Sequence, residues 1–253
     1  MDRLRAERDF HDQQAHARRQ AWACSTSDPL HFDPDWYLDH ETWIRPAFSL
    51  MGEVRGKQVL DYGCGHGMAG VLLAQRGAAV TAFDLSGGYV QEALARAAAN
   101  DPAANYQAVQ AVGERLPFAD RSFDRIWGHA ILHHLDLPVA AAELKRVLSP
   151  DGWAVFCEPW GGNPLIEGFR KWLPYPGKHR TVNEQPLQPL DVAVLRRFFS
   201  RVEEYPYQLF GGVRRLWRQA PCLSTLDRFD TSLFRHWRPL RKFCRYMVLL
   251  LRP

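Results

Sequence analysis

A glycine-rich run around residue 63 constrains the fold more than any other feature of the sequence. Residues 58–67 read Q-V-L-D-Y-G-C-G-H-G, and an apolar segment, M-A-G-V-L-L-A-Q, follows at 68–75. Glycines at every second position allow a tight turn whose bare backbone can approach a ligand closely. We therefore expect a buried strand, a turn, and a helix whose N-terminal N–H groups face a bound molecule.

The spacing of these glycines relative to two carboxylates narrows the choice of ligand. Gly63, Gly65 and Gly67 form G-x-G-x-G, which differs from the G-x-G-x-x-G of dinucleotide sites. Asp61 stands just before them, where its charge repels a pyrophosphate and attracts an ammonium group. The next apolar segment ends on Asp84, and a carboxylate at that position can accept hydrogen bonds from two ribose hydroxyls. Together these residues predict a nucleoside with a cationic amino-acid tail, which is S-adenosylmethionine.

The same run resembles the first motif of the class I S-adenosylmethionine-dependent methyltransferases, V-L-D-x-G-C-G-x-G. The resemblance is close over 57–158 and weak toward both ends of the chain. It implies a doubly wound, mostly parallel α/β sheet of seven strands, Rossmann-like, with the last strand inserted antiparallel beside the fifth. It also implies that Asp61, the three glycines and Asp84 bind the cofactor.

Apolar and amphipathic segments alternate after residue 57, as a parallel sheet with crossover helices requires. Strands are expected at about 58–61, 80–84, 106–109, 123–128, 153–158, 202–208 and 243–251. Helices are expected at about 68–76, 88–100, 139–148 and 190–199. Two leading helices, 1–22 and 35–54, would make 1–56 a helical cap on a domain of 57–253. Substrate-side insertions are expected at about 159–190 and 212–242.

The stretch at 111–124, A-V-G-E-R-L-P-F-A-D-R-S-F-D, resembles the family loop that packs on the adenine of the cofactor. The family's acid, which binds the adenine amino group, is replaced here by Val112. Backbone groups near Gly113 and Glu114 are then expected to hold the ring, with apolar packing from Leu85 and Val112.

Four histidines are candidates for contact with the cofactor or the acceptor. His129 ends the fourth strand, where the family's backbone carbonyl faces the ammonium group. His133 and His134 follow in a short turn, and either imidazole can act as a general base because it titrates near neutral pH. The alternative is that one of the pair packs structurally. His11 lies in E-R-D-F-H-D-Q-Q-A, which resembles the cap helix that closes over the cofactor in many small-molecule members; a surface histidine is the alternative.

Other positions leave a choice between packing and ligand contact. Trp160, Trp172 and Tyr175 are expected either to form an aromatic wall for a flat or apolar acceptor or to pack in the core. Arg180 and Glu184 are expected to form an ion pair that fixes their loop or to touch the substrate. The fourth strand is followed by G-H-A-I and not by N-P-P-[YF], which argues against nucleobase and protein-amide methylation.

Composition and charge exclude further classes. No apolar run approaches the ~20 residues of a membrane helix, and the N-terminus has no apolar signal region. Five cysteines form no C-x-x-C pair, so we expect a reduced, cytoplasmic protein without a metal site. The charge is uneven, since 196–253 contain 13 Lys/Arg against 4 Asp/Glu. That surplus could serve an anionic substrate or a membrane surface, or form a solvated face, and no nucleic-acid motif accompanies it.

We therefore predict methyl transfer from S-adenosylmethionine to a small-molecule acceptor, with O-methylation of a metabolite or natural product as the first choice. Two alternatives remain open. The basic C-terminal third suggests a lipid or membrane-surface methyltransferase that makes peripheral membrane contact. Val112 suggests a cofactor-binding module without transferase activity.

Overall fold

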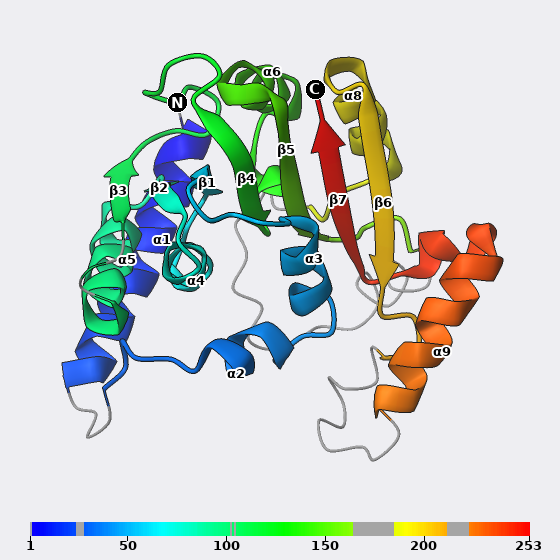
Figure 1. Cartoon of the computed structure of the whole chain (residues 1–253), viewed down its shortest axis with the longest axis horizontal. Helices are drawn as coiled ribbons and strands as arrows, with labels where there is room; N and C mark the ends of the chain where they lie inside the picture. The colour runs from blue at the N-terminus through cyan, green and yellow to red at the C-terminus, as the bar shows by residue number, and fades with distance from the viewer. Residues whose placement is uncertain (1, 24–27, 102, 104, 164–184, 212–222) are drawn as a thin grey trace.

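The computed structural model describes residues 2–23, 28–101, 103, 105–163, 185–211 and 223–253, which form one sheet with helices on both faces (Figure 1). The strands are β1 (Gln58–Tyr62), β2 (Ala79–Asp84), β3 (Tyr106–Gln110), β4 (Phe123–His129), β5 (Leu148–Pro159), β6 (Arg201–Tyr207) and β7 (Tyr246–Arg252). The α-helices are α1 (Asp2–Ala23), α2 (Pro34–Asp39), α3 (Ile44–Leu50), α4 (Met68–Gln75), α5 (Gly87–Asn100), α6 (Leu137–Val147), α8 (Pro189–Phe198) and α9 (Leu223–His236). Two short 3-10 helices are η1 (Leu132–His134) and η3 (Arg238–Phe243).

The sheet order is β3-β2-β1-β4-β5-β7-β6. All neighbouring pairs from β3 to β5 are parallel, and β7 runs antiparallel to both β5 and β6. The doubly wound sheet and its antiparallel last strand, both predicted from the sequence, are thereby confirmed. The strand order reverses between β1 and β4, and ligands of such sheets bind beyond the carboxyl ends of the strands at this point.

The central strands are apolar on both faces because helices cover both faces. Successive residues of a strand point to opposite sides, so Leu60 and Val59 belong to two different cores. The first core contains Leu144 of α6 and Leu195 of α8. The second contains Phe48 of α3 and also includes residues of α2 and α4.

The prediction of one helix over 35–54 is wrong, because the segment folds as two short helices, α2 and α3. Asp33 caps α2 by accepting a hydrogen bond from the backbone N–H of Asp35. Pro46 lies in the first turn of α3, where the missing N–H is not needed. In a continuous helix the Pro46 ring would clash with the carbonyl of Thr42, so the helix has to begin again just before the proline.

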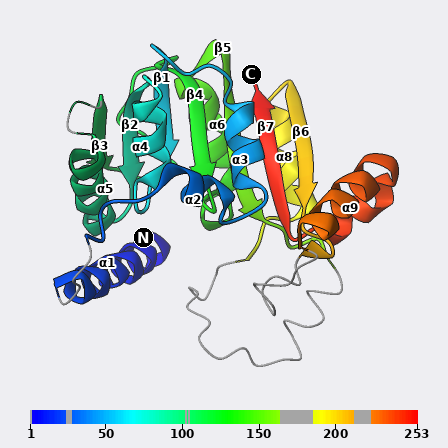
Figure 2. The same ribbon diagram turned by 60° about the horizontal axis from the view of Figure 1, so that its bottom comes forward.

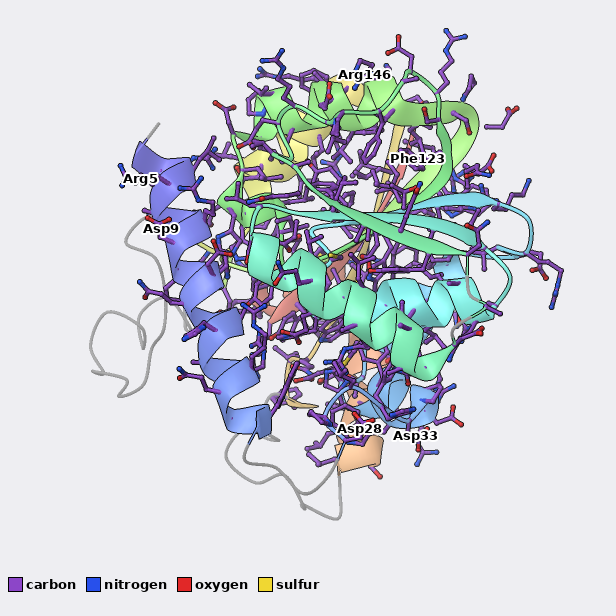
Figure 3. All side chains as sticks on the ribbon, turned by 90° about the vertical axis from the view of Figure 1, so that its left-hand side faces the viewer. Arg5, Asp9, Asp28, Asp33, Phe123 and Arg146 are labelled. Carbon is purple, nitrogen blue, oxygen red and sulfur yellow. The ribbon has the colours of Figure 1, made fainter. Side chains whose placement is uncertain are left out.

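Helix α1 lies across the carboxyl ends of the strands and not on either face of the sheet (Figure 2). Its inner face docks on α5: Asp12 accepts hydrogen bonds from the hydroxyl of Ser86 and, at 3.1 Å, from the N–H of Gly88. Both donors lie at the N-terminus of α5, which favours a negative charge. Arg5 and Asp9 lie on the outer face of α1 (Figure 3).

The segment after β5 is described only at its ends. Trp160 is buried in the first core, which supports core packing for this residue. Trp172, Tyr175, Arg180 and Glu184 lie outside the described residues. Nowhere in the described ranges is there a helix of the length and apolarity that a bilayer crossing needs.

Candidate active site

A cavity of about 530 Å³ lies beneath α1 at the carboxyl ends of β1, β2 and β4. Every site residue predicted from the sequence lines it except His133. The residues it thereby brings together are His11, Asp61, Gly63, Gly65, Gly67, Asp84, Leu85, Gly113, Glu114, His129 and His134.

The three glycines between β1 and α4 all have positive φ, which a side chain rarely tolerates. A Cβ at Gly67 would stand 2.7 Å from Ala93, so this glycine lets α5 pack against the turn. A Cβ at Gly65 would meet no atom within 4 Å. Gly65 therefore leaves open space in the cavity wall, where a ligand can contact the backbone.

Asp61 is a buried carboxylate in the wall of this cavity. Its Oδ2 has no hydrogen-bond partner among the described residues. Burial raises the pKa of Asp61 to about 7; the N–H of Gly70 opposes the shift, and the charge of Asp84 adds to it. A Cβ at Gly70 would stand 2.6 Å from Oδ2, so α4 packs directly on the carboxylate. A ligand with a positive charge would stabilise the ionised form of Asp61.

Asp84 ends β2 and is held in place by two backbone N–H groups, both at 2.9 Å. Gly65 donates to its Oδ2 and Ser86 to its Oδ1. Burial raises the pKa of Asp84, although these two hydrogen bonds oppose the shift. The carboxylate therefore has a fixed orientation toward the cavity before any ligand arrives.

The loop after β3 forms a further wall. The hydroxyl of Tyr62 donates to the carbonyl of Gly113 at 2.7 Å, which fixes the loop over β1. Val112 lines the cavity where the family places an acid. Glu114 accepts hydrogen bonds from Arg3 and from the N–H of Asp136, and its Oε2 is buried with no partner in the described part of the chain. Glu114 thus offers a carboxylate oxygen on a loop that lacks the usual one.

His129 presents a neutral imidazole to the cavity. The ring is half-buried and packs edge-on against Trp43, with 4.7 Å between ring centroids. Burial lowers the pKa of His129 to about 4, and the nearby charge of Glu158 only partly opposes this shift. A neutral ring is compatible with a cation at the neighbouring Asp61.

His133 points away from the main cavity and lines a smaller pocket of about 260 Å³. Its Nδ1 lies 2.7 Å from Oε2 of Glu158. Glu158 also accepts hydrogen bonds from the N–H groups of Ile131 and Leu132, at 3.0 and 2.9 Å. Burial raises the pKa of Glu158, but these bonds and the charge of His133 outweigh it and hold the pKa below its usual range. The arrangement supports the structural alternative for His133: it fixes the turn η1.

His134, the next residue of η1, lines the main cavity and faces α1. Its Nδ1 lies 3.4 Å from Oε2 of Glu7. The same Glu7 oxygen lies 3.5 Å from Nε2 of His11. Burial lowers the pKa of His11. The hydrogen bond to Glu7 and the charges of Asp84 and Glu7 together raise the pKa by more, so the net shift is upward. One carboxylate therefore lies between an imidazole of α1 and an imidazole of η1.

Glu7 was not predicted from the sequence, although a signal exists. Glu7 and His11 are four residues apart, which places both on one face of a helix.

Trp36 and His40 of the broken leading segment also line the cavity, with stacked rings 5.4 Å apart. Their position depends on the break before α3, which the expectation of one helix missed. No group of three or more His, Cys, Asp or Glu within the described ranges is arranged to hold a metal ion.

Residues 60–156 match a family model described as a methyltransferase domain. This part of the chain is therefore a methyltransferase domain. The family and fold expected from the glycine motif are thereby confirmed, and so is the cofactor of that family.

Two relatives illustrate the similarity. This methyltransferase is 31% identical over 147 residues to the 2-phytyl-1,4-naphtoquinone methyltransferase of a Nostoc species, over 54% of this chain and 63% of that protein. It is 42% identical over 121 residues to the malonyl-[acyl-carrier protein] O-methyltransferase of Erwinia billingiae, over 47% of this chain and 45% of that protein. The chain thus spans about half the length of the curated relatives it matches.

A solved structure shares the whole architecture. Magnesium protoporphyrin IX methyltransferase from Synechocystis PCC 6803, with bound S-adenosylhomocysteine, has a TM-score of 0.60 against this methyltransferase. The match covers 99% of this chain and 100% of the other at 15% identity, which establishes a common fold.

The cavity of the methyltransferase fits the family's cofactor in two observations. Asp61 has a buried, unpartnered carboxylate oxygen, which suits an ammonium group. Gly65 leaves the space that a Cβ would fill, beside a carboxylate, Asp84, already oriented by backbone N–H groups. Asp61, Gly65 and Asp84 would thus hold the methionyl tail and the ribose.

Proposed function

We propose that this methyltransferase transfers the methyl group of S-adenosylmethionine to a hydroxyl group of a small molecule. The observation that carries the proposal is one cavity lined by two sets of residues. The first set comprises the carboxylates and the open glycine turn that suit the cofactor. The second set comprises Glu7 and His11 of α1 with His134 of η1, beside which an acceptor can lie.

The residues of the first set have separable roles. Asp61 binds the ammonium group, Asp84 the ribose hydroxyls, and the loop at Val112 and Glu114 the adenine. When bound, the cofactor supplies a methyl group on a positively charged sulfur that leaves as a neutral thioether. Alignment of the acceptor with that methyl group supplies much of the rate.

The second set supplies a base for the acceptor's proton. A hydroxyl oxygen that gains a methyl group has to lose its proton. The imidazole of His134 lines the cavity and can accept that proton. The carboxylate of Glu7, 3.4 Å from Nδ1 of His134, then stabilises the imidazolium. A positioned base of this kind contributes roughly 10²–10⁴-fold to the rate.

The comparisons support the choice of acceptor class. The two relatives carry the names of a naphthoquinone methyltransferase and an O-methyltransferase acting on malonyl-[acyl-carrier protein]. The second name supports oxygen as the acceptor atom, and a hydroxyl oxygen of a small molecule is the acceptor that we expect here.

The test is incubation of the purified chain with methyl-labelled S-adenosylmethionine and a fractionated extract of the source cells. Label in a small metabolite, with the labelled methyl group bound to an oxygen atom, would support the proposal. Label confined to protein or nucleic acid would contradict it. Bound S-adenosylhomocysteine without label in any fraction would favour a cofactor-binding module.

The matched variant is Asp84→Ala. It should weaken binding of S-adenosylhomocysteine by roughly 1.5–3 kcal/mol, because charge-assisted hydrogen bonds to the ribose are lost. Calorimetry measures the change directly. Asp151→Ala, a change at an exposed aspartate after α6, is the control and should leave the affinity unchanged. Unchanged affinity in Asp84→Ala would mean that the ribose lies elsewhere.

A further inference from the structure

Three exposed aromatic side chains lie on or next to α9, at one corner of the molecule (Figure 1). Phe210 follows β6, Phe229 lies on α9 and Trp237 follows α9; they are 50%, 51% and 65% exposed. The rings of Phe210 and Phe229 are 5.9 Å apart. Trp36 is the one other Phe or Trp among the described residues that is comparably exposed. We call Phe210, Phe229 and Trp237 the aromatic corner. Exposed apolar groups in a cluster indicate a binding surface.

The surroundings of the aromatic corner are positively charged. Residues 223–253 contain seven Arg/Lys against two Asp. One of these acids, Asp230, is buried and accepts hydrogen bonds from the N–H groups of Leu209, Phe210 and Gly211. The exposed cationic side chains around the corner are Arg228, Arg235, Arg238 and Lys242.

The aromatic corner is connected to the wall of the active-site cavity. Asp230 fixes the loop after β6, and Gln208 of that loop donates to Glu41 at 2.6 Å. Glu41 lies between α2 and α3, and α2 carries Trp36, which lines the cavity and is 58% exposed. Helix α2 lies between α1 and α9 along the edge of the sheet where the cavity opens (Figures 1 and 2). A surface held against the aromatic corner would thus face the same edge as the cavity.

We propose that the aromatic corner docks on the surface of an anionic lipid bilayer. Trp and Phe rings bury their apolar bodies at the headgroup level, and Arg and Lys next to them bind acidic lipids. The charge complementarity selects an anionic surface. The protruding rings select a bilayer over a nucleic acid, which would use the charges and leave three aromatic side chains in water. The active-site cavity then opens along the membrane, where an apolar acceptor would be found.

The test is sedimentation of the full chain with vesicles of phosphatidylcholine containing a third phosphatidylglycerol, at low and high salt. The chain should pellet at low salt and be released at high salt, because screening weakens the attraction to acidic lipids. Pure phosphatidylcholine vesicles should retain much less. Phe229→Ser with Trp237→Ser should reduce binding at least tenfold, and Arg235→Ser or Lys242→Ser by roughly fivefold each. All these side chains are exposed, so the affinity for S-adenosylhomocysteine should not change.

Helix α8, which packs with α6 on one face of the sheet, provides the matched controls (Figure 1). Leu190→Ser removes a side chain that is 79% exposed, and Arg197→Ser removes an exposed charge. Both should pellet like the parent chain. Absence of pelleting at low salt would overturn the proposal, as would equal losses in the α8 variants. Tighter binding to a DNA duplex than to the anionic vesicles, unaffected by Phe229→Ser and Trp237→Ser, would overturn it in favour of nucleic acid.

Discussion

Two adjacent histidines of this methyltransferase have different surroundings because of the carboxylates they meet. His133 is hydrogen-bonded to Glu158 and does not line the main cavity, whereas His134 lines it beside Glu7. The sequence shows a histidine pair, but the choice between the two depends on how η1 is oriented by the hydrogen bonds that the N–H groups of Ile131 and Leu132 donate to Glu158. Glu7 belongs to a different element and reaches the site only when α1 docks.

His134→Gln should reduce kcat roughly 10²-fold or more, with the affinity for S-adenosylhomocysteine unchanged, because the base is lost and the cofactor contacts remain. Glu7→Gln should reduce kcat less, since the base remains and only the carboxylate beside it is lost. Rates are measured with the acceptor identified from the labelled extract. His16→Gln, on the exposed part of α1, is the control.

Nuclear magnetic resonance titration of the imidazoles gives a readout independent of the acceptor. In Glu7→Gln the pKa of His11 should fall, because the hydrogen bond and the charge that raise it are removed. A full rate in His134→Gln would show that the acceptor's proton leaves by another route.

Helix α1 is the element whose docking completes the site, and one side chain carries much of that docking. Asp12→Ala removes the acceptor for Ser86 and Gly88 at the N-terminus of α5. The loss of about 1.5–3 kcal/mol should raise amide exchange in 3–22 roughly ten- to a hundredfold, with the sheet unchanged. Asp9→Ala, on the outer face, should leave exchange as it is. Equal exchange in the two variants would show that other contacts hold α1.

Several elements follow from local sequence, and others require the tertiary structure. The turn after β1 follows from its glycines, and the start of α5 from Ser86, whose hydroxyl caps the helix. The break between α2 and α3 has a local cause in Pro46. The aromatic residues of 35–54 have helical spacing, which led to the prediction of one continuous helix. The loop around Val112 shows a missing acid in the sequence, but the buried Oε2 of Glu114 is visible only in the fold.

The stability of the whole molecule should depend on pH through Asp61. Its pKa of about 7 in the fold lies above the ordinary value of 3.8. Between these values the folded protein holds a proton that the unfolded chain has released, so the contribution of Asp61 is present at pH 4 and is lost as the pH rises through 7. The ionised, unpartnered carboxylate costs on the order of 4 kcal/mol at pH 8.

Asp61→Asn cannot ionise, so it should unfold at a higher temperature than the parent chain at pH 8 and at a similar temperature at pH 4. It should also lose most of its affinity for S-adenosylhomocysteine, because the ammonium group loses its counter-charge. Thermal unfolding at both pH values, with and without S-adenosylhomocysteine, measures both effects. Asp151→Asn is the surface control. A stability difference that does not change with pH would rule out this role for Asp61.

The position of β7 between β5 and β6 constrains the order in which the sheet can form during synthesis. A ribosome releases β6 before β7, yet β6 has no partner in the described sheet except β7. During synthesis β5 therefore presents an open edge, and β6 waits unpaired until Met247 to Leu251 emerge and fill the apolar gap. A nascent chain in that interval exposes strand edges that invite pairing with other chains. We infer that β7 completes the sheet by pairing with β5 and β6. The nascent chain should therefore bind chaperones most strongly just before β7 is synthesised.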